Sequence, residues 1–217
     1  MAEGARFRLY GRPFWGSAIV EAQLAWYGLP FDYDAVDDLF QSAAARAALA
    51  PMNPLAQVPT LVLPDGRVLT ESAAITLHLA DATGRDDLVP RADAAERPAF
   101  LRWLVFLVAN LYPTFTYADD PQRFVRDAAA AKAFAEAVED YRRRLWGIVE
   151  SAAGAPWFLG PRFSALDLYV AVMTHWRPGR AWFDTEAPKL AAVAQRAGAE
   201  PRLREVWLHN FPKDFAA

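Results

Sequence analysis

The sequence predicts an α/β domain followed by an all-helical domain. Three observations support this prediction. Short apolar runs of strand length alternate with helical patterns up to Gly84, and every apolar pattern beyond Asp93 has a helical period. Between them, residues 85–93 carry charge, one proline and little periodicity, as linkers do. We therefore predict domains at residues 1–84 and 94–217, joined by a linker at 85–93.

The first 50 residues predict the order strand, helix, strand, helix. Residues 7–10 and 31–36 alternate in hydrophobicity with period two. The helical pattern between them begins at Ser17 and is closed by Gly28. An alanine-rich segment at 41–50 ends before a proline and predicts a short helix. A strand, a crossover helix and a second strand form a parallel unit with a right-handed crossover.

The next stretch predicts a β-hairpin and then a helix. Apolar runs at 60–63 and 68–70 flank a Pro-Asp-Gly-Arg turn. Ser72 is placed as the N-cap of the following helix, and Gly84 as its C-cap. The resulting order, βαβαββα, is that of a thioredoxin-like domain.

The rest of the chain predicts helices only. One helix spans 95–111 and is stopped or kinked by Pro113, and short helices lie near 188–197 and 201–208. Ser164 and Asp167 form the capping box of another helix, so Asp167 is structural. A long helix near 121–151 presents one apolar stripe formed by Phe134, Val138, Tyr141, Leu145 and Ile148. The run of arginines at 142–144 predicts a solvated face of that helix.

Two features of the hairpin region point to a binding site. X-Pro bonds are the ones that become cis at low cost, and a cis Val58–Pro59 bond would turn the N–H and C=O of Val58 outward to pair with a peptide. The helix that begins at Ser72 offers free N–H groups and a positive dipole end to a carboxylate. Together they describe a site for a small acidic peptide. The alternative is an ordinary strand start and a helix cap.

The Val-Pro pair, the hairpin, the Glu71-Ser72 pair and the capping box together resemble the glutathione transferase family, across nearly the whole chain. The likeness is to bacterial members, here without cysteine, and the subclass is unassigned. By this resemblance Val58 would hold the cysteinyl backbone of glutathione, and Glu71 and Ser72 its γ-glutamyl group. Gln57 and Pro59 complete the predicted glutathione-binding residues.

The chain contains no cysteine, so the reactive sulfur must arrive with the ligand. In the family, a side chain at the end of the first strand or the start of the first helix activates the thiol of glutathione. The candidates are Tyr10 and Ser17, and we favour Ser17 as the catalytic residue. A gapless match to the beta-class opening places Gly16 at the position of the beta-class cysteine. Ser17 as a helix cap only, with backbone groups activating the thiol, is the open alternative.

The predicted function is transfer of glutathione to a small hydrophobic electrophile. Glutathione serves as co-substrate, and no metal is expected because the three histidines are isolated in sequence. The alternatives are a non-catalytic glutathione-binding or scaffold protein of the same fold, or a glutathione-dependent isomerase or peroxidase. The predicted substrate pocket comprises Tyr10, Arg12, Phe14, Trp15, Trp103, Phe106 and Asn110.

Composition excludes several other partners. A net charge of −3 without a Lys/Arg-rich cluster argues against nucleic acid. The sequence contains no stretch of about 18 uncharged apolar residues that would predict a membrane span, and no long apolar core follows its first six residues. We expect a soluble cytoplasmic protein, and the family resemblance implies a homodimer.

Overall fold

A computed structural model describes residues 6–215 and divides the chain into two compact units. The first unit contains the chain up to Val89 together with the segment from Arg196, and the second runs from Pro90 to Gln195. The segment from Arg196 thus packs with the N-terminal part of the chain, whereas the predicted domain 94–217 groups it with the helices before it. The division into domains at 84 and 94 stays a prediction, because compact packing and independent folding are different properties.

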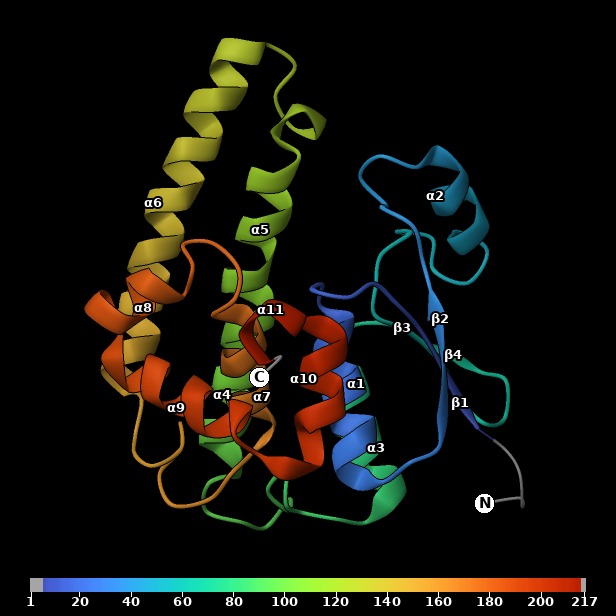
Figure 1. Cartoon of the computed structure of the whole chain (residues 1–217), viewed down its shortest axis with the longest axis vertical. Helices are drawn as coiled ribbons and strands as arrows, with labels where there is room; N and C mark the ends of the chain where they lie inside the picture. The colour runs from blue at the N-terminus through green and yellow to red at the C-terminus, as the bar shows by residue number, and fades with distance from the viewer. Residues whose placement is uncertain (1–5, 216–217) are drawn as a thin grey trace. The chain divides into compact units, whose positions relative to one another are not determined.

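The first unit contains a four-stranded mixed sheet in the order β2-β1-β3-β4 (Figure 1). β1 pairs in parallel with β2 and antiparallel with β3, and β3 forms a hairpin with β4. The strands are β1 (Phe7–Gly11), β2 (Phe31–Ala35), β3 (Thr60–Val62) and β4 (Val68–Leu69). This confirms the thioredoxin-like arrangement, including the parallel βαβ unit and the hairpin.

The helices of this unit follow the predicted order, with α1 and α3 on the same side of the sheet (Figure 1). They are α1 (Ser17–Tyr27), α2 (Ala43–Leu49) and α3 (Ser72–Thr83). Near the C-terminus come a 3₁₀ turn (Pro201–Leu203), α10 (Arg204–Asn210) and the unpredicted α11 (Pro212–Phe215). Both the 3₁₀ turn and α10 contact α1. The first helix is therefore enclosed by the sheet, α3 and the C-terminal segment.

Helices α1 and α3 end where the sequence predicts, but their N-terminal caps differ from the prediction. Gly28 and Gly84 close these helices in the left-handed conformation, at φ 66° and 64°, as predicted. At their starts, however, Ser17 and Ser72 are the first helical residues, and the N-caps are Gly16 and Glu71. The predictions of Ser17 and Ser72 as N-caps were each wrong by one residue, within the usual uncertainty of helix ends.

The second unit is helical throughout its regular structure. Its helices are α4 (Arg97–Phe106), a π-helical segment (Leu107–Leu111), α5 (Tyr112–Asp119), a 3₁₀ turn (Pro121–Arg123), α6 (Ala128–Ala152), α7 (Ala165–Met173), α8 (Arg180–Glu186) and α9 (Pro188–Gly198), whose last turn enters the first unit. Sequence patterns missed α8. This unit and the sheet domain together confirm the predicted fold class.

Pro113 does not stop the helix that precedes it. The chain passes from α4 through the π-helical segment into α5, and Pro113 is the second residue of α5. Proline is tolerated in the first turn after such an irregularity, because the N–H that it lacks has no ordinary partner there. The run Arg97–Asp119 is long and apolar enough to cross a membrane by length and composition, a property that buried helices of soluble proteins share.

The long helix α6 begins later than predicted. The segment before it forms the 3₁₀ turn, and Asp127 caps the helix by accepting a 2.8 Å hydrogen bond from the Ala130 N–H. The predicted apolar stripe was only partly correct, since Tyr141 and Ile148 are exposed. The buried positions are Ala131, Val138, Arg142, Leu145, Trp146 and Val149.

Arg142 was wrongly predicted to be solvated, and its side chain has no exposed surface. Its guanidinium donates to the hydroxyl of Thr114 at 2.9 Å, to the Thr114 carbonyl at 2.8 Å and to the Glu139 carboxylate at 2.7 Å. The same group lies 4.3 Å from the ring centre of Phe115. Arg142 therefore joins α6 to the first turn of α5, directly after the π-helical segment.

The capping box at the start of α7 is confirmed. The Asp167 carboxylate accepts hydrogen bonds from the N–H groups of Ser164 and Phe158, both at 2.7 Å. Burial raises the pKa of Asp167 to about 6, although these hydrogen bonds act in the opposite direction. The side chain thus holds the entry of α7 against the preceding loop.

Replacing Arg142 by methionine should lower the free energy of unfolding by about 2 to 3 kcal/mol, because the buried Thr114 carbonyl and hydroxyl would lose a charged donor. Denaturant titration measures the loss. Arg143→Met is the matched control, since Arg143 is exposed on the same helix, and it should change stability by less than about 0.5 kcal/mol. Equal effects of the two variants would contradict the role assigned to Arg142.

Candidate functional site

The loop before β3 leaves the backbone of Val58 unpaired. The Val58–Pro59 peptide bond is cis, and neither the N–H nor the C=O of Val58 makes a hydrogen bond within residues 6–215. Val58 is half-buried and Pro59 is buried, while Gln57 is exposed. A free donor and acceptor on one residue can pair with an extended peptide.

Asn53, to which the sequence analysis gave no role, holds this loop. Its side-chain amide donates to the Gln57 carbonyl at 2.9 Å and to the Thr60 hydroxyl at 3.1 Å, while its oxygen accepts from the Leu55 N–H at 3.1 Å. Asn53 is 4% exposed. The signal available in the sequence was an asparagine in the loop that precedes the proline, a residue able to bond to nearby backbone groups.

The hairpin brings Val58 and the start of α3 to one end of the sheet. Leu61 pairs with Leu69, so the chain before Thr60 and the chain after Leu69 leave the hairpin together. Glu71, the N-cap residue of α3, is exposed and has φ 63° and ψ 106°. Positive φ in a non-glycine residue outside tight turns is uncommon and is typical of ligand-binding positions. Ser72 is 9% exposed and begins the helix, where backbone N–H groups are free.

Ser17 is placed at the start of α1, but its hydroxyl is enclosed. The hydroxyl accepts a hydrogen bond from the Arg12 N–H and donates one to the Arg12 carbonyl, both at 3.0 Å. Ser17 is 0% exposed. In this arrangement the hydroxyl has no exposed surface to offer a thiol, and the catalytic role of Ser17 stays a prediction.

Gly11 allows this close packing. A Cβ at Gly11 would lie 2.8 Å from the Cβ and Oγ of Ser17 and 2.8 Å from the Tyr33 hydroxyl. The Tyr33 hydroxyl is buried without a well-formed hydrogen bond to the described residues, and burial raises the pKa of Tyr33, although the nearby Ser17 hydroxyl acts against the rise. Two hydroxyl groups therefore converge at the end of β1, where a larger residue would separate them.

Tyr10 faces away from this point. Phe7, Leu9 and Gly11 are buried, while Arg8 is exposed and its guanidinium lies 5.7 Å from the ring centre of Tyr10. Successive side chains of a strand point to opposite faces of the sheet, so Tyr10 and Ser17 lie on opposite sides of β1. Tyr10 is half-buried on that face.

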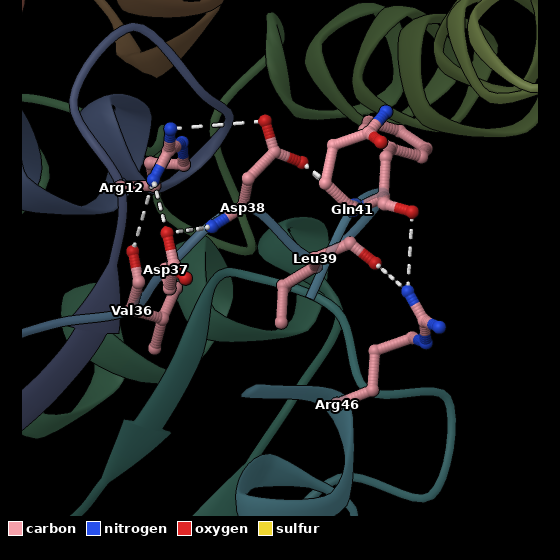
Figure 2. Close-up of polar contacts among 8 residues, drawn as sticks. Arg12, Val36, Asp37, Asp38, Leu39, Gln41 and Arg46 are labelled. Carbon is pink, nitrogen blue, oxygen red and sulfur yellow. Dashed lines mark hydrogen bonds and ion pairs between the residues drawn. The ribbon is translucent and has the colours of Figure 1, made fainter. Parts of the chain in front are cut away.

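Arg12 links the loops that follow β1 and β2 (Figure 2). Its guanidinium donates to the Val36 carbonyl at 3.4 Å and lies 3.7 Å from the carboxylates of Asp37 and of Asp38. Arg46 of α2 holds the same loop by donating to the Leu39 carbonyl at 2.7 Å. The loops at the carboxyl ends of two parallel strands are thus joined, which is where ligands bind in open α/β sheets.

The two aromatic residues of the β1–α1 loop differ in exposure. Trp15 is half-buried, with its ring 5.1 Å from that of Phe40 and 5.6 Å from the Arg12 guanidinium. Phe14 is 48% exposed, has φ 72° and contacts Phe211 edge to face at 5.6 Å. Phe14 therefore presents an aromatic surface beside the start of α1.

The remaining predicted pocket residues belong to the second unit. Trp103 is 5% exposed and packs edge to face against Phe106 and Phe158, at 5.2 and 5.5 Å. Phe106 is half-buried and Asn110 is exposed. Trp103 is a core residue of its unit, and a pocket shared by these residues and the first unit stays a prediction.

A cavity of about 370 Å³ lies elsewhere in the second unit, between α8 and α9. Its lining includes Arg180, Phe183, Asp184, Pro188 and Gln195. None of the predicted site residues lines it.

Comparisons with known proteins decide the family. Residues 17–82 match the family model described as glutathione S-transferase, N-terminal domain. The chain is 39% identical, over 204 residues, to an uncharacterized GST-like protein, YncG of Escherichia coli, covering 94% of this chain and 98% of that protein. This chain belongs to the glutathione S-transferase family.

Solved structures of the family agree. A sphingomonad glutathione S-transferase complexed with glutathione is 26% identical, with a TM-score of 0.73 over 92% of this chain and 96% of that one. A transferase homologue from Sulfitobacter with bound glutathione is 22% identical and has a TM-score of 0.81 over 97% and 99% of the two chains, which shows the shared fold.

Gly11→Ala should destabilise this transferase-family protein by about 1 to 3 kcal/mol, because a methyl group cannot fit between Ser17 and Tyr33 without moving them. Gly147→Ala is the matched control. Gly147 lies in α6 with nothing within 4 Å of an added Cβ, so this variant should gain up to about 1 kcal/mol. Thermal or denaturant unfolding measures both, and a stable Gly11→Ala variant would contradict the close approach.

Proposed function

We propose that this protein binds glutathione and activates its thiol for attack on a small hydrophobic electrophile. One observation carries the proposal: the hairpin brings the unpaired backbone of Val58 to the start of α3, where Glu71 and Ser72 stand. Val58 would pair with the cysteinyl backbone of glutathione, between Gln57 and Pro59. Glu71 would hold the γ-glutamyl ammonium group, and the Ser72 end of α3 its carboxylate. Bound glutathione in family members supports this assignment.

Activation of the glutathione thiol requires only a modest lowering of its pKa. A thiol with a pKa of about 8.5 is only a few per cent ionised at neutral pH, and a shift of one unit corresponds to about 1.4 kcal/mol. The start of α1, with its N–H groups and the Ser17 hydroxyl, would stabilise the thiolate. Ser17 would have to turn its proton from the Arg12 carbonyl to the sulfur. The thiol proton passes to solvent, and the thiolate attacks an electrophilic carbon. A carbon–sulfur bond forms as the bond from that carbon to a leaving group breaks and the group departs with its electron pair, or as a π bond of the electrophile opens and takes up a proton from solvent.

Other roles of the same fold remain as candidates. The enclosed Ser17 hydroxyl favours a glutathione-binding or scaffold protein without thiol activation. Isomerase or peroxidase activity would use the same thiolate. We further propose a cytoplasmic homodimer whose apolar electrophile contacts the β1–α1 loop at Arg12, Phe14 and Trp15.

Glutathione titrated into the protein in a calorimeter should bind with a micromolar to low-millimolar Kd. Glu71→Gln should weaken this binding at least tenfold, about 1.4 kcal/mol, because the ammonium group would lose its counter-ion. Asp65→Asn is the control: it removes an exposed carboxylate from the turn of the same hairpin and should leave the Kd unchanged. An unchanged Kd for glutathione in Glu71→Gln would contradict the assignment of Glu71 to the binding site.

Ser17→Ala tests thiol activation separately from binding. The ultraviolet absorbance of bound thiolate, followed against pH, should show a thiol pKa raised by about one unit and a lower kcat if the hydroxyl contributes. Ser42→Ala is the control, since it removes another serine at a helix start, the N-cap of α2. An unaltered thiol pKa in Ser17→Ala would assign activation to backbone groups alone.

A further inference from the structure

A buried carboxylate lies on α1, one turn beyond Ser17. Glu21 is 5% exposed, in a helix whose residues from Ser17 to Leu24 are all buried. Residues four apart lie on the same helix face, with Cβ atoms roughly 6 Å apart, so Glu21 stands behind the start of α1. Burial raises the pKa of Glu21. A charge in this position requires compensation.

The compensation comes from α10. His209 Nδ1 lies 2.8 Å from Glu21 Oε1, and the Asn210 amide donates to Glu21 Oε2 at 2.9 Å. Asn210 is 2% exposed and also donates to the Val206 carbonyl at 2.9 Å. Both oxygens of the carboxylate are therefore bound by side chains of α10.

The same segment contacts the β1–α1 region at two further points. The His209 ring meets the Tyr33 ring edge to face at 4.7 Å, and the Tyr33 hydroxyl adjoins Ser17 at Gly11. Phe211 packs against Phe14, the exposed loop residue with positive φ. The segment His209–Phe211 thus touches the first helix, the second strand and the loop that surrounds Ser17.

We propose that His209 and Asn210 are positioning residues for the thiol site, acting through Glu21 to keep the start of α1 free of net negative charge. The inference rests on the proposed function, since it concerns the thiolate bound there. His209 Nδ1 and the Asn210 amide contact the two oxygens of the Glu21 carboxylate, and a proton shared in the His209 contact would offset the charge of that carboxylate. Without His209, the Glu21 carboxylate would keep only the Asn210 amide as a partner, and its ionised form would oppose a thiolate at the same end of the helix, so the thiol would ionise less readily.

Among the described residues, the polar groups that bond to Glu21 are His209 and Asn210 of α10, and the Tyr33 hydroxyl is close enough to feel the charge of Glu21. The residues that would bind the rest of glutathione, Glu71 and Ser72, lie on α3 instead. Loss of His209 should therefore change the ionisation of the thiol more than the affinity for glutathione.

The test compares His209→Ala, Glu21→Gln and the double variant, all in the full chain. His209→Ala should raise the pKa of the bound thiol by about one unit and lower kcat up to tenfold at neutral pH, with KM for glutathione changed less than twofold. The double variant removes both partners of the pair, so its thiol pKa should return to within a few tenths of the wild-type value. Lys213→Ala, which removes an exposed cation from the same segment, should leave the thiol pKa unchanged.

The outcomes separate this inference from the function on which it rests. Wild-type protein that binds no glutathione, or binds it without a lowered thiol pKa, overturns both. A lowered thiol pKa in wild type that His209→Ala leaves unaltered overturns only the role of His209. If the double variant is as impaired as His209→Ala, or if KM rises in parallel with the loss of kcat, His209 holds the C-terminal segment in place without acting through Glu21.

Discussion

The complete burial of α1 is the constraint on which the first unit depends. Eight consecutive residues from Ser17 to Leu24 are buried, so the polar ones among them must find partners inside the protein. Ser17 bonds to the Arg12 backbone, Glu21 to α10, and Gln23 to the Thr76 hydroxyl of α3 at 2.9 Å. Each of these three residues therefore binds a different neighbouring segment.

These three anchors explain how the candidate site is held. The bond to Arg12 shapes the loop after β1, and Arg12 in turn meets the loop after β2. The bond to Thr76 fixes α1 to α3, whose first residues adjoin the unpaired Val58. The bonds to His209 and Asn210 bring in a segment from the far end of the chain. One enclosed helix thus places two loops, one helix end and the C-terminal segment around a single region.

In the second unit, too, a buried polar side chain, that of Arg142, binds a neighbouring element. The π-helical segment and Pro113 interrupt the regular hydrogen bonding between α4 and α5. Arg142 reaches the backbone just beyond this interruption and satisfies the Thr114 carbonyl, while the Phe115 ring covers the guanidinium. A buried arginine here stabilises an irregular helix, in the middle of a run of three arginines that looks solvent-facing in the sequence.

The sequence by itself determined the elements whose signals are local. Each such signal lies within a few residues of the element that it specifies. The structure contains all of them: the period-two runs, the Pro-Asp-Gly-Arg turn, the glycines at 28 and 84, and the Ser164–Asp167 box. The family resemblance rests on the same local signals. The position of Val58 and Glu71 at one end of the sheet could be foreseen because the hairpin between them is short.

Only the tertiary structure decided which partners the buried polar side chains contact. Glu21 and His209 are 188 positions apart, Arg142 and Thr114 28 apart, and Tyr33 meets Ser17 through a glycine on a third element. Helical periodicity assigned Tyr141 to the core and Arg142 to solvent, and it could not show that the Ser17 hydroxyl is enclosed by its own loop. Such partners depend on which distant segments pack together, because burial makes a polar group seek whatever donor or acceptor the fold brings near.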